Sequence, residues 1–284
     1  MPAVTWSDEV HEVLVGDPTA ALAYTTPQRG VVVTPVSPLG LADREAGTLA
    51  FTSALAFGRK LNRILRDPRV ALCYHARDYG SSTSRTLVLA QGDAEVSLHP
   101  PEDRLAALHE RMADRFGGRK QGTLWDWIQY EADHQRAFVD ITVTRLVTWG
   151  ERTPHDWTSL DGSPWPDPPG SQDPPARGTH ARIDPAEAAR RLAPLPHRLI
   201  GYLGSDGFPV VRPVQTAGID GDRIRLEAPT AALPPGGRRA GLLGHRYTPH
   251  CAAPAGWSRP KQAPSTLRSP LAASRPHRCA PPAC

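Results

Sequence analysis

The chain has 284 residues, of which 31 are proline, 24 are glycine and only 5 are phenylalanine, so part of it cannot form packed interior. Its net charge of +4 arises at one end, because residues 249–284 hold five of the 33 bases and no acid, which leaves 28 bases against 29 acids elsewhere. A nearly neutral body excludes nucleic acid as the expected partner, and the length allows one large domain or two modest ones.

The chain begins with a helix and three strands. Ser7 is followed by acids and by apolar residues at helical spacing, which predicts a short helix that ends before Gly16. Leu61, Ile64 and Leu65 recur at helical intervals and predict a second helix, which Asp67-Pro68 ends. Between the two helices, apolar runs bounded by turn residues predict strands at 21–25, 31–36 and 48–52.

Three further strands and two helices complete the first half. Glu102 begins a clearly amphipathic helix, and a second helical stretch is predicted from Leu124 to Arg136. Strands are predicted at 69–74, 86–98 and 137–149, with Gly92 as a candidate bulge. Consecutive strands are joined too tightly for βαβ crossovers. The sequence therefore predicts a mainly β fold with helices (α+β), in the form of a small barrel.

A hairpin-like segment occurs twice in the chain. Tyr24, Val32 and Pro35 return as Tyr202, Val210 and Pro213 at one offset of 178 residues. Between the copies the chain is rich in Pro, Asp, Gly and Ser, which is typical of an extended linker. We therefore divide the chain into four parts: a complete barrel at 1–150, a Pro-rich linker at 151–182, a partial second copy of the barrel at 183–248, and a tail at 249–284.

The tail loses all strand periodicity and holds three of the four cysteines. Its composition fits either a disordered segment or a shifted reading frame, and both interpretations stay open. The cysteines show no C-x-x-C spacing and no paired histidines, so no metal site is expected. Cys73 lies in an apolar run and is expected to be a buried thiol.

No membrane partner is expected, because no stretch of the sequence approaches the length of a membrane span. The first 17 residues lack a basic segment followed by an apolar core, so they do not resemble a secretory signal. We therefore expect a cytoplasmic protein.

One local constellation could hold a phosphate group. The strand that ends in Phe51-Thr52-Ser53 is followed by a loop and then by Gly58-Arg59-Lys60-Leu61-Asn62 at a helix start. Hydroxyls at a strand exit and two bases beside helix N-terminal amides are the donors that a phosphate requires. The alternative interpretation of Arg59 and Lys60 is a solvated helix face.

Five segments together resemble the pyridoxamine 5′-phosphate oxidase-like family of FMN-binding split β-barrels, which includes deazaflavin-dependent reductases. They are Val33–Val36, Thr48–Ser53, the Arg59-Lys60-x-Asn62 helix start, Asp67–Leu72 and Gln91–Glu95. The resemblance spans residues 21–149 and recurs weakly over 199–247. It implies a split barrel whose cofactor is FMN, with deazaflavin or haem as alternatives.

The resemblance also implies roles for individual residues. Thr34, Pro35 and Val36 are expected to line the flavin ring, and Thr52, Ser53 and Lys60 to hold the ribityl chain and phosphate. Arg59 and Asn62 are further candidates. The implied activity is oxidation or reduction of an unidentified small-molecule substrate, and no residue is assigned as acid, base or nucleophile. The alternatives are a non-catalytic module that binds flavin or haem, and a damaged copy that binds neither. Family members dimerise, so a homodimer or an intramolecular pseudo-dimer is expected.

Overall fold

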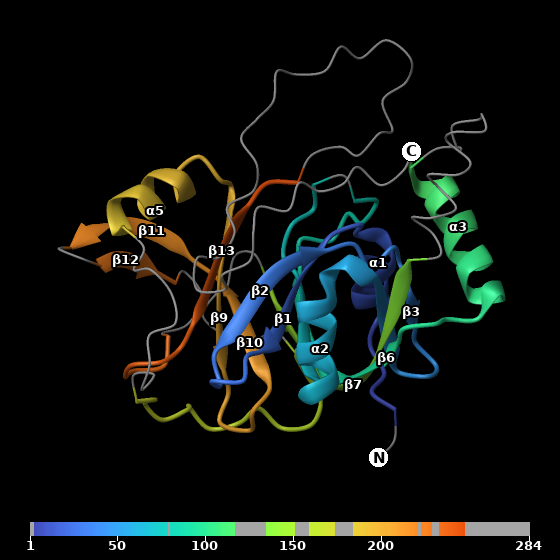
Figure 1. The fold of residues 1–284 in the computed structure, drawn as a ribbon, viewed down its shortest axis with the longest axis horizontal. Helices are drawn as coiled ribbons and strands as arrows, with labels where there is room; N and C mark the ends of the chain where they lie inside the picture. The colour runs from blue at the N-terminus through green and yellow to red at the C-terminus, as the bar shows by residue number, and fades with distance from the viewer. Residues whose placement is uncertain are drawn as a thin grey trace, which may run out of the picture.

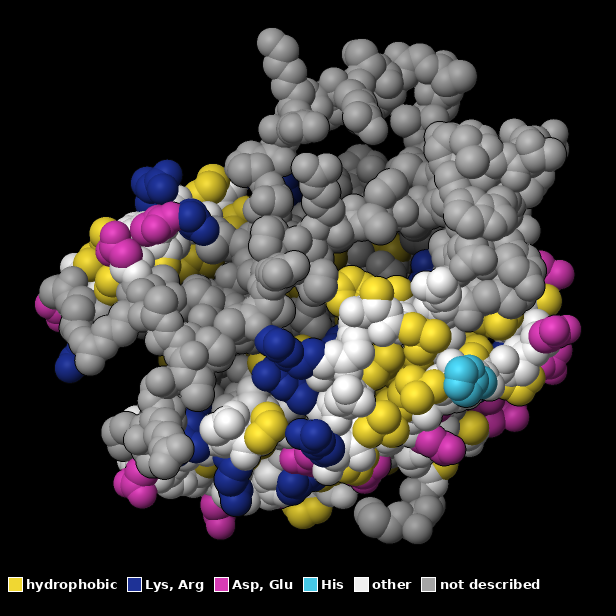
Figure 2. Space-filling model, in the orientation of Figure 1, with side chains coloured by type: hydrophobic (Ala, Val, Ile, Leu, Met, Phe, Trp, Pro, Cys, Tyr) yellow, Lys and Arg dark blue, Asp and Glu magenta, His cyan; other side chains and the backbone are white. Residues whose placement is uncertain are grey.

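The computed structural model describes residues 3–78, 80–116, 135–150, 159–173, 184–220, 223–228 and 233–247. The predicted helical stretch at 124–136 lies outside these ranges except for its last two residues, and the tail at 249–284 lies wholly outside them. In the described part of the chain, no helix is both long and apolar enough to cross a membrane. Figure 2 shows basic and acidic side chains on the same face of the molecule, so this face has no single sign of charge.

The first half of the chain forms an eight-stranded antiparallel sheet (Figure 1). Its order is β2-β1-β5-β6-β7-β4-β3, with β8 paired to β7. The strands are β1 (Ala20–Thr25), β2 (Val31–Val36), β3 (Ala42–Asp43), β4 (Thr48–Ala54), β5 (Arg69–Tyr74), β6 (Leu87–Ser97), β7 (Arg136–Trp149) and β8 (Ser159–Gly162). The mainly β, α+β prediction is confirmed. The strand pairings of the described residues leave β2 and β3 as separate ends, so hydrogen bonds do not close the sheet.

All six predicted strands of the first half are present, and two short strands, β3 and β8, were not predicted. Strand β8 lies within the Pro-rich segment. The bulge predicted at Gly92 is confirmed, because the register of β6 against β7 shifts between Gln91 and Gly92. A side chain at position 92 would collide with the carbonyl oxygen of Thr142, so the close approach of the strands requires glycine there.

The helices of the first half cover the apolar face of this sheet. Helix α1 (Asp8–Gly16) begins where the Ser7 hydroxyl accepts the Val10 amide at 3.3 Å, and it buries Val10, Val13 and Leu14. A 3-10 turn, η1 (Leu55–Phe57), leads from β4 into α2 (Gly58–Arg66), which buries Leu61 and Ile64 and ends before Asp67. Helix α3 (Glu102–Phe116) packs separately, through Leu105 and Leu108 against Leu39 and Phe138.

The second half forms a smaller sheet whose pairing repeats that of the first. Helix α5 (Pro185–Leu192) precedes a three-stranded sheet of order β10-β9-β13 and a separate β11-β12 ribbon. Leu199 pairs with Pro213 as Ala21 pairs with Pro35, at the same offset of 178. Strand β13 then pairs with β9 as β5 pairs with β1. The bounds are β9 (His197–Leu203), β10 (Pro209–Pro213), β11 (Gln215–Asp220), β12 (Arg223–Glu227) and β13 (Gly241–His245).

The three-stranded sheet lies against the outer face of β1, β2 and β5, as Figure 1 shows. Val31 donates its amide to the carbonyl of Arg239 at 3.2 Å, and Gly201 lies directly against Val31 and Val33. Cys73 is part of the apolar cluster that the two sheets share. It is 1% exposed, and burial raises the pKa of its thiol to about 12, so the prediction of a buried thiol is confirmed.

Candidate functional site

The exit of β4 and the start of α2 form a corner that contains two cations. The ammonium of Lys60 lies 4.9 Å from the ring centroid of Phe57 and 5.8 Å from that of Phe51, at distances where aromatic faces attract a cation. Arg136 is the first residue of β7 and lies opposite Ala54. Its guanidinium donates to the hydroxyl of Thr52 at 3.1 Å. We call Thr52, Lys60 and Arg136 the cationic corner.

The electrostatics of this corner favour an anion. Burial lowers the pKa of Lys60 to about 8, and the nearby charge of Arg136 lowers it further in the same direction. Among the described residues, no carboxylate lies within ion-pair distance of Lys60. A negative charge placed between the two cations would reverse both effects, because it would stabilise the ammonium form.

The start of α2 adds backbone donors beside the cationic corner. Helix α2 has no side-chain cap at its N-terminus, so its first amides have no side-chain acceptor there. A side chain built at Gly58 would meet no atom within 4 Å, which indicates open space at the first residue of the helix. Uncapped amides, open space and two nearby cations are together the features of a phosphate site.

The remaining predicted phosphate residues are arranged differently. Ser53 is buried next to Thr52, and its hydroxyl approaches the carbonyl of Ala54 at 3.4 Å. Arg59 and Asn62 lie on the exposed side of α2. The charge of Arg59 is felt at Tyr24, where it opposes the rise that burial causes in the pKa of the phenol. The structure therefore brings Thr52 and Lys60 together, with Ser53 beside Thr52.

The residues predicted to line the flavin ring lie on a different strand. Thr34, Pro35 and Val36 belong to β2 and pair with Leu22, Ala21 and Ala20 of β1. Thr34 and Pro35 are half-buried, and Val36 is buried. Strand β2 ends the sheet opposite β3 and β4 in the strand order, and no contact described in the structure joins these three residues to Lys60.

Sequence reasoning missed Arg136 as a site residue. The sequence assigned it to the end of a helix, whereas it begins β7. Its position opposite the exit of β4 depends on the register of two strands that lie more than 80 residues apart. The one available signal was a base immediately before the alternating run of residues 137–149.

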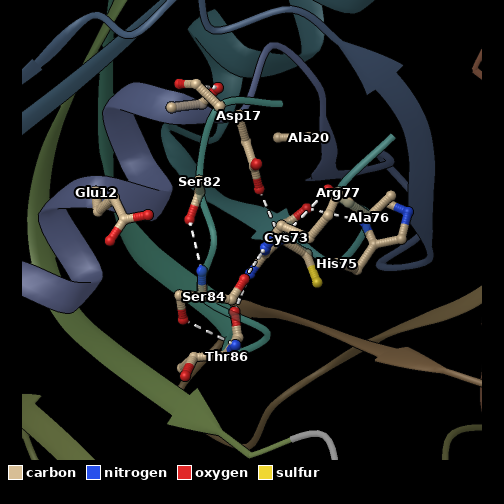
Figure 3. A network of polar contacts seen from close by, with 12 residues as sticks. Glu12, Asp17, Ala20, Cys73, His75, Ala76, Arg77, Ser82, Ser84 and Thr86 are labelled. Carbon is tan, nitrogen blue, oxygen red and sulfur yellow. Dashed lines mark hydrogen bonds and ion pairs between the residues drawn. The ribbon is translucent and has the colours of Figure 1, made fainter. Parts of the chain in front are cut away.

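A separate network of polar contacts holds the loop after β5 against α1 (Figure 3). Arg77 forms an ion pair with the fully buried Asp17 at 2.6 Å and donates to the carbonyls of Ser84 and Thr86. Glu12 accepts the Thr83 amide at 2.6 Å. These contacts tie residues 77–86 to α1, and they give this network a structural role.

Three histidines lie where the two halves of the chain meet. The Nε2 atoms of His75 and His245 are 2.8 Å apart, and the His197 ring lies 5.5 Å from His75 and 5.1 Å from His245, measured between centroids. His197 also contacts the carboxylate of Asp78 at 2.5 Å, and the Tyr247 ring lies 4.5 Å from His245. A hydrogen bond between two imidazole nitrogens needs one donor and one acceptor, so at least one of the pair is neutral.

The environment of the histidine pair favours neutral rings. Burial lowers the pKa of His75 to about 4. Burial, followed by the neighbouring imidazoles, lowers the pKa of the fully buried His245 further. His75 and His245 occupy matching places in the two sheets, because each follows the strand position that pairs with the first residue of the hairpin repeat.

Comparison with known proteins gives matches among solved structures. No protein-family model matches the chain, and no curated protein matches it at the significance threshold. A conserved hypothetical protein from Mycobacterium tuberculosis is similar at 19% identity and a TM-score of 0.40, covering 54% of this chain and 89% of its own. An F420 reductase is similar at 19% identity and a TM-score of 0.34, covering 48% of this chain and 94% of its own.

A putative pyridoxamine 5′-phosphate oxidase from Listeria innocua is similar at 12% identity and a TM-score of 0.36, covering 51% of this chain and 98% of its own. Proteins of the class that the sequence motifs resemble are therefore among the solved structures to which this chain is similar.

Proposed function

We propose that this chain binds FMN through the cationic corner and acts as a flavin-dependent oxidoreductase on a small molecule, with deazaflavin as the alternative cofactor. The observation that carries the proposal is the placement of Lys60 beside Arg136 at the uncapped start of α2, with no described carboxylate in ion-pair distance of Lys60. The motif resemblance over residues 21–149 supports the identity of the cofactor.

The residues of the cationic corner fit a phosphate group chemically. Lys60 and Arg136 supply two positive charges for a dianion, and the Thr52 hydroxyl can donate to a phosphate oxygen while it accepts from Arg136. The Phe51 and Phe57 rings hold the ammonium in place without neutralising it. The burial that lowers the pKa of Lys60 also keeps water away, which strengthens the attraction between the ammonium and an anion.

A bound flavin supplies the redox chemistry, and the protein binds and orients it. In this proposal the cationic corner fixes the phosphate end, while Thr34, Pro35 and Val36 of β2 contact the ring. No residue of the chain is assigned a proton-transfer role.

We also propose that residues 183–248 are a partial copy of the first barrel and serve as its partner in an intramolecular pseudo-dimer. The equal offset of 178 in both hairpin registers supports this, as does the equivalent placement of β5 and β13. The expected result is a monomer whose mass in solution does not change with concentration. A stable homodimer would instead favour the other assembly that the family resemblance implies.

The binding proposal is tested by titrating FMN into the purified protein and following the quenching of flavin fluorescence. Lys60→Ala is expected to weaken binding by about 1.5–3 kcal/mol, because a charged hydrogen bond is lost. That corresponds to about 10- to 150-fold in the dissociation constant. Arg66→Ala is the matched control, since Arg66 is an exposed base at the other end of the same helix.

Two outcomes would contradict the proposal. One is an affinity for FMN that is the same in the wild type, Lys60→Ala and Arg66→Ala. The other is a wild-type protein that binds neither FMN nor deazaflavin. If FMN binds, its reduction by nicotinamide donors in the presence of the protein then tests the oxidoreductase activity separately from binding.

A further inference from the structure

We propose that Arg212 forms a second binding site, for a small flat carboxylate, between β10 and the indole rings of Trp149 and Trp165. This site lies in the second half of the chain and shares no residue with the cationic corner. It is independent of the proposal that the chain binds a flavin.

Arg212 is a buried cation whose hydrogen-bonding groups are not satisfied. The residue is 6% exposed and pairs with Ile200 in the middle of the three-stranded sheet. Its Nε and Nη1 atoms are buried and have no hydrogen-bond partner among the described residues. The guanidinium carbon lies 5.2 Å from the Trp149 ring centroid and 6.0 Å from that of Trp165. Two aromatic faces thus flank a guanidinium that retains unused donors.

A neighbouring arginine shows how the chain satisfies such a group when it supplies the acceptors itself. Arg145 is 5% exposed and lies 5.5 Å from the same Trp165 ring. It forms an ion pair with Asp206 at 2.8 Å and donates to Gln91 at 2.7 Å. Arg212 has no comparable acid among the described residues. A buried guanidinium without a counter-charge is strongly unfavourable, so an anion from solution would stabilise the fold at this point.

The nearest acidic group of the core does not supply the missing charge. The charge of Arg212 is felt at the thiol of Cys73, yet burial raises the pKa of that thiol to about 12. Cys73 is therefore neutral at physiological pH.

The surroundings define the class of anion. One uncompensated positive charge is neutralised by a monoanion, whereas a phosphate dianion would bury excess negative charge. A planar guanidinium matches a carboxylate better than it matches a spherical halide, and the indole faces favour a flat ligand. We therefore assign the site to a carboxylate such as acetate or benzoate, rather than to phosphate or chloride.

The test uses the full-length protein, with acetate, benzoate, phosphate and chloride as probes at constant ionic strength. Binding is followed by tryptophan emission, because Trp149 and Trp165 flank the guanidinium, and by the melting temperature. Benzoate and acetate are expected to change the emission and raise the melting temperature of the wild type. Arg212→Met is expected to weaken both responses by about tenfold or more, because it removes a charged hydrogen bond.

Two further variants keep the test decisive. Arg212→Lys retains the charge but loses the planar fork, so it is expected to bind carboxylates more weakly than the wild type does. Arg225→Met is the matched control, because Arg225 is an exposed arginine in a loose ion pair with Asp220 at 3.6 Å, and it should respond as the wild type does. Equal responses in Arg212→Met, Arg212→Lys and the wild type would overturn the proposal. So would a wild type that responds to phosphate or chloride as strongly as to the carboxylates, or to none of them.

Discussion

Acidification should loosen the junction between the two halves of the chain through His75 and His245. Both imidazoles have a pKa below the 6.5 of an exposed histidine, and that of His75 lies at about 4. A group whose pKa is lowered by folding binds more protons in the unfolded state at intermediate pH. The stability that the neutral pair provides is therefore present in full above pH 6.5 and is lost as the pH falls towards 4.

The size of this loss follows from the shift of the pKa. Between pH 7 and pH 5, a histidine whose pKa moves from 6.5 to about 4 on folding costs about 2 kcal/mol in the free energy of unfolding. His245 contributes about the same over that interval, since its pKa is lower still. The pair should therefore cost about 4 kcal/mol, a large part of the 5–15 kcal/mol that stabilises a typical domain.

Urea unfolding at pH 7, 6 and 5 measures this loss directly. The double variant His75→Gln with His245→Gln keeps amide groups at the junction but does not titrate, so its stability should change much less over this interval. His99→Gln is the matched control, because His99 is exposed and lies outside the cluster. The groups around the pair are His197, Asp78, Arg77 and Tyr247, and all remain in both proteins. The reasoning would be refuted if the wild type and the double variant lost stability equally between pH 7 and pH 5.

Other perturbations test single features of the fold. Gly92→Ala should destabilise the sheet by about 1–3 kcal/mol through overpacking, because the new methyl group meets the Thr142 carbonyl; urea unfolding would measure it, and an unchanged midpoint would contradict the role of the bulge. Asp17→Asn should cost about 3–5 kcal/mol, because it leaves the Arg77 charge without its buried partner; a loss well under 1 kcal/mol would contradict that role for the ion pair. Cys73 should react with thiol reagents only after unfolding, since it is buried and its pKa is raised to about 12; fast labelling of the native protein would contradict this.

Local patterns were sufficient to predict the strands and helices of the first half, because each has its own periodicity or terminating residue. Val31–Val36 and the helix ended by Asp67 are examples, and so is the bulge at Gly92. Strand β8 was missed because its four residues, Ser159–Gly162, have no apolar alternation and form a strand only by pairing with β7. Tertiary pairing decided that element, and its own composition did not.

The candidate site was predictable in part for the same reason. Lys60 and Thr52 flank one strand-to-helix connection, so their proximity follows from local sequence. Arg136 joins them only through the register of β4 against β7. The histidine pair was hidden by a change of offset: the hairpins repeat at 178 residues, whereas His75 and His245 differ by 170 because the second copy is shorter before its last strand. Arg212 has a role only because the indoles of Trp149 and Trp165 lie beside it.

The sheet that covers the outer face of β1, β2 and β5 belongs to the same polypeptide, and this has a consequence for how the protein behaves on dilution. Tethering gives the two surfaces a high effective concentration, which does not fall when the number of molecules per litre falls. Their association is therefore a first-order event, as a separate subunit's would not be. At nanomolar levels in a cell, this apolar surface would still be covered, whereas a two-chain assembly of similar strength would dissociate.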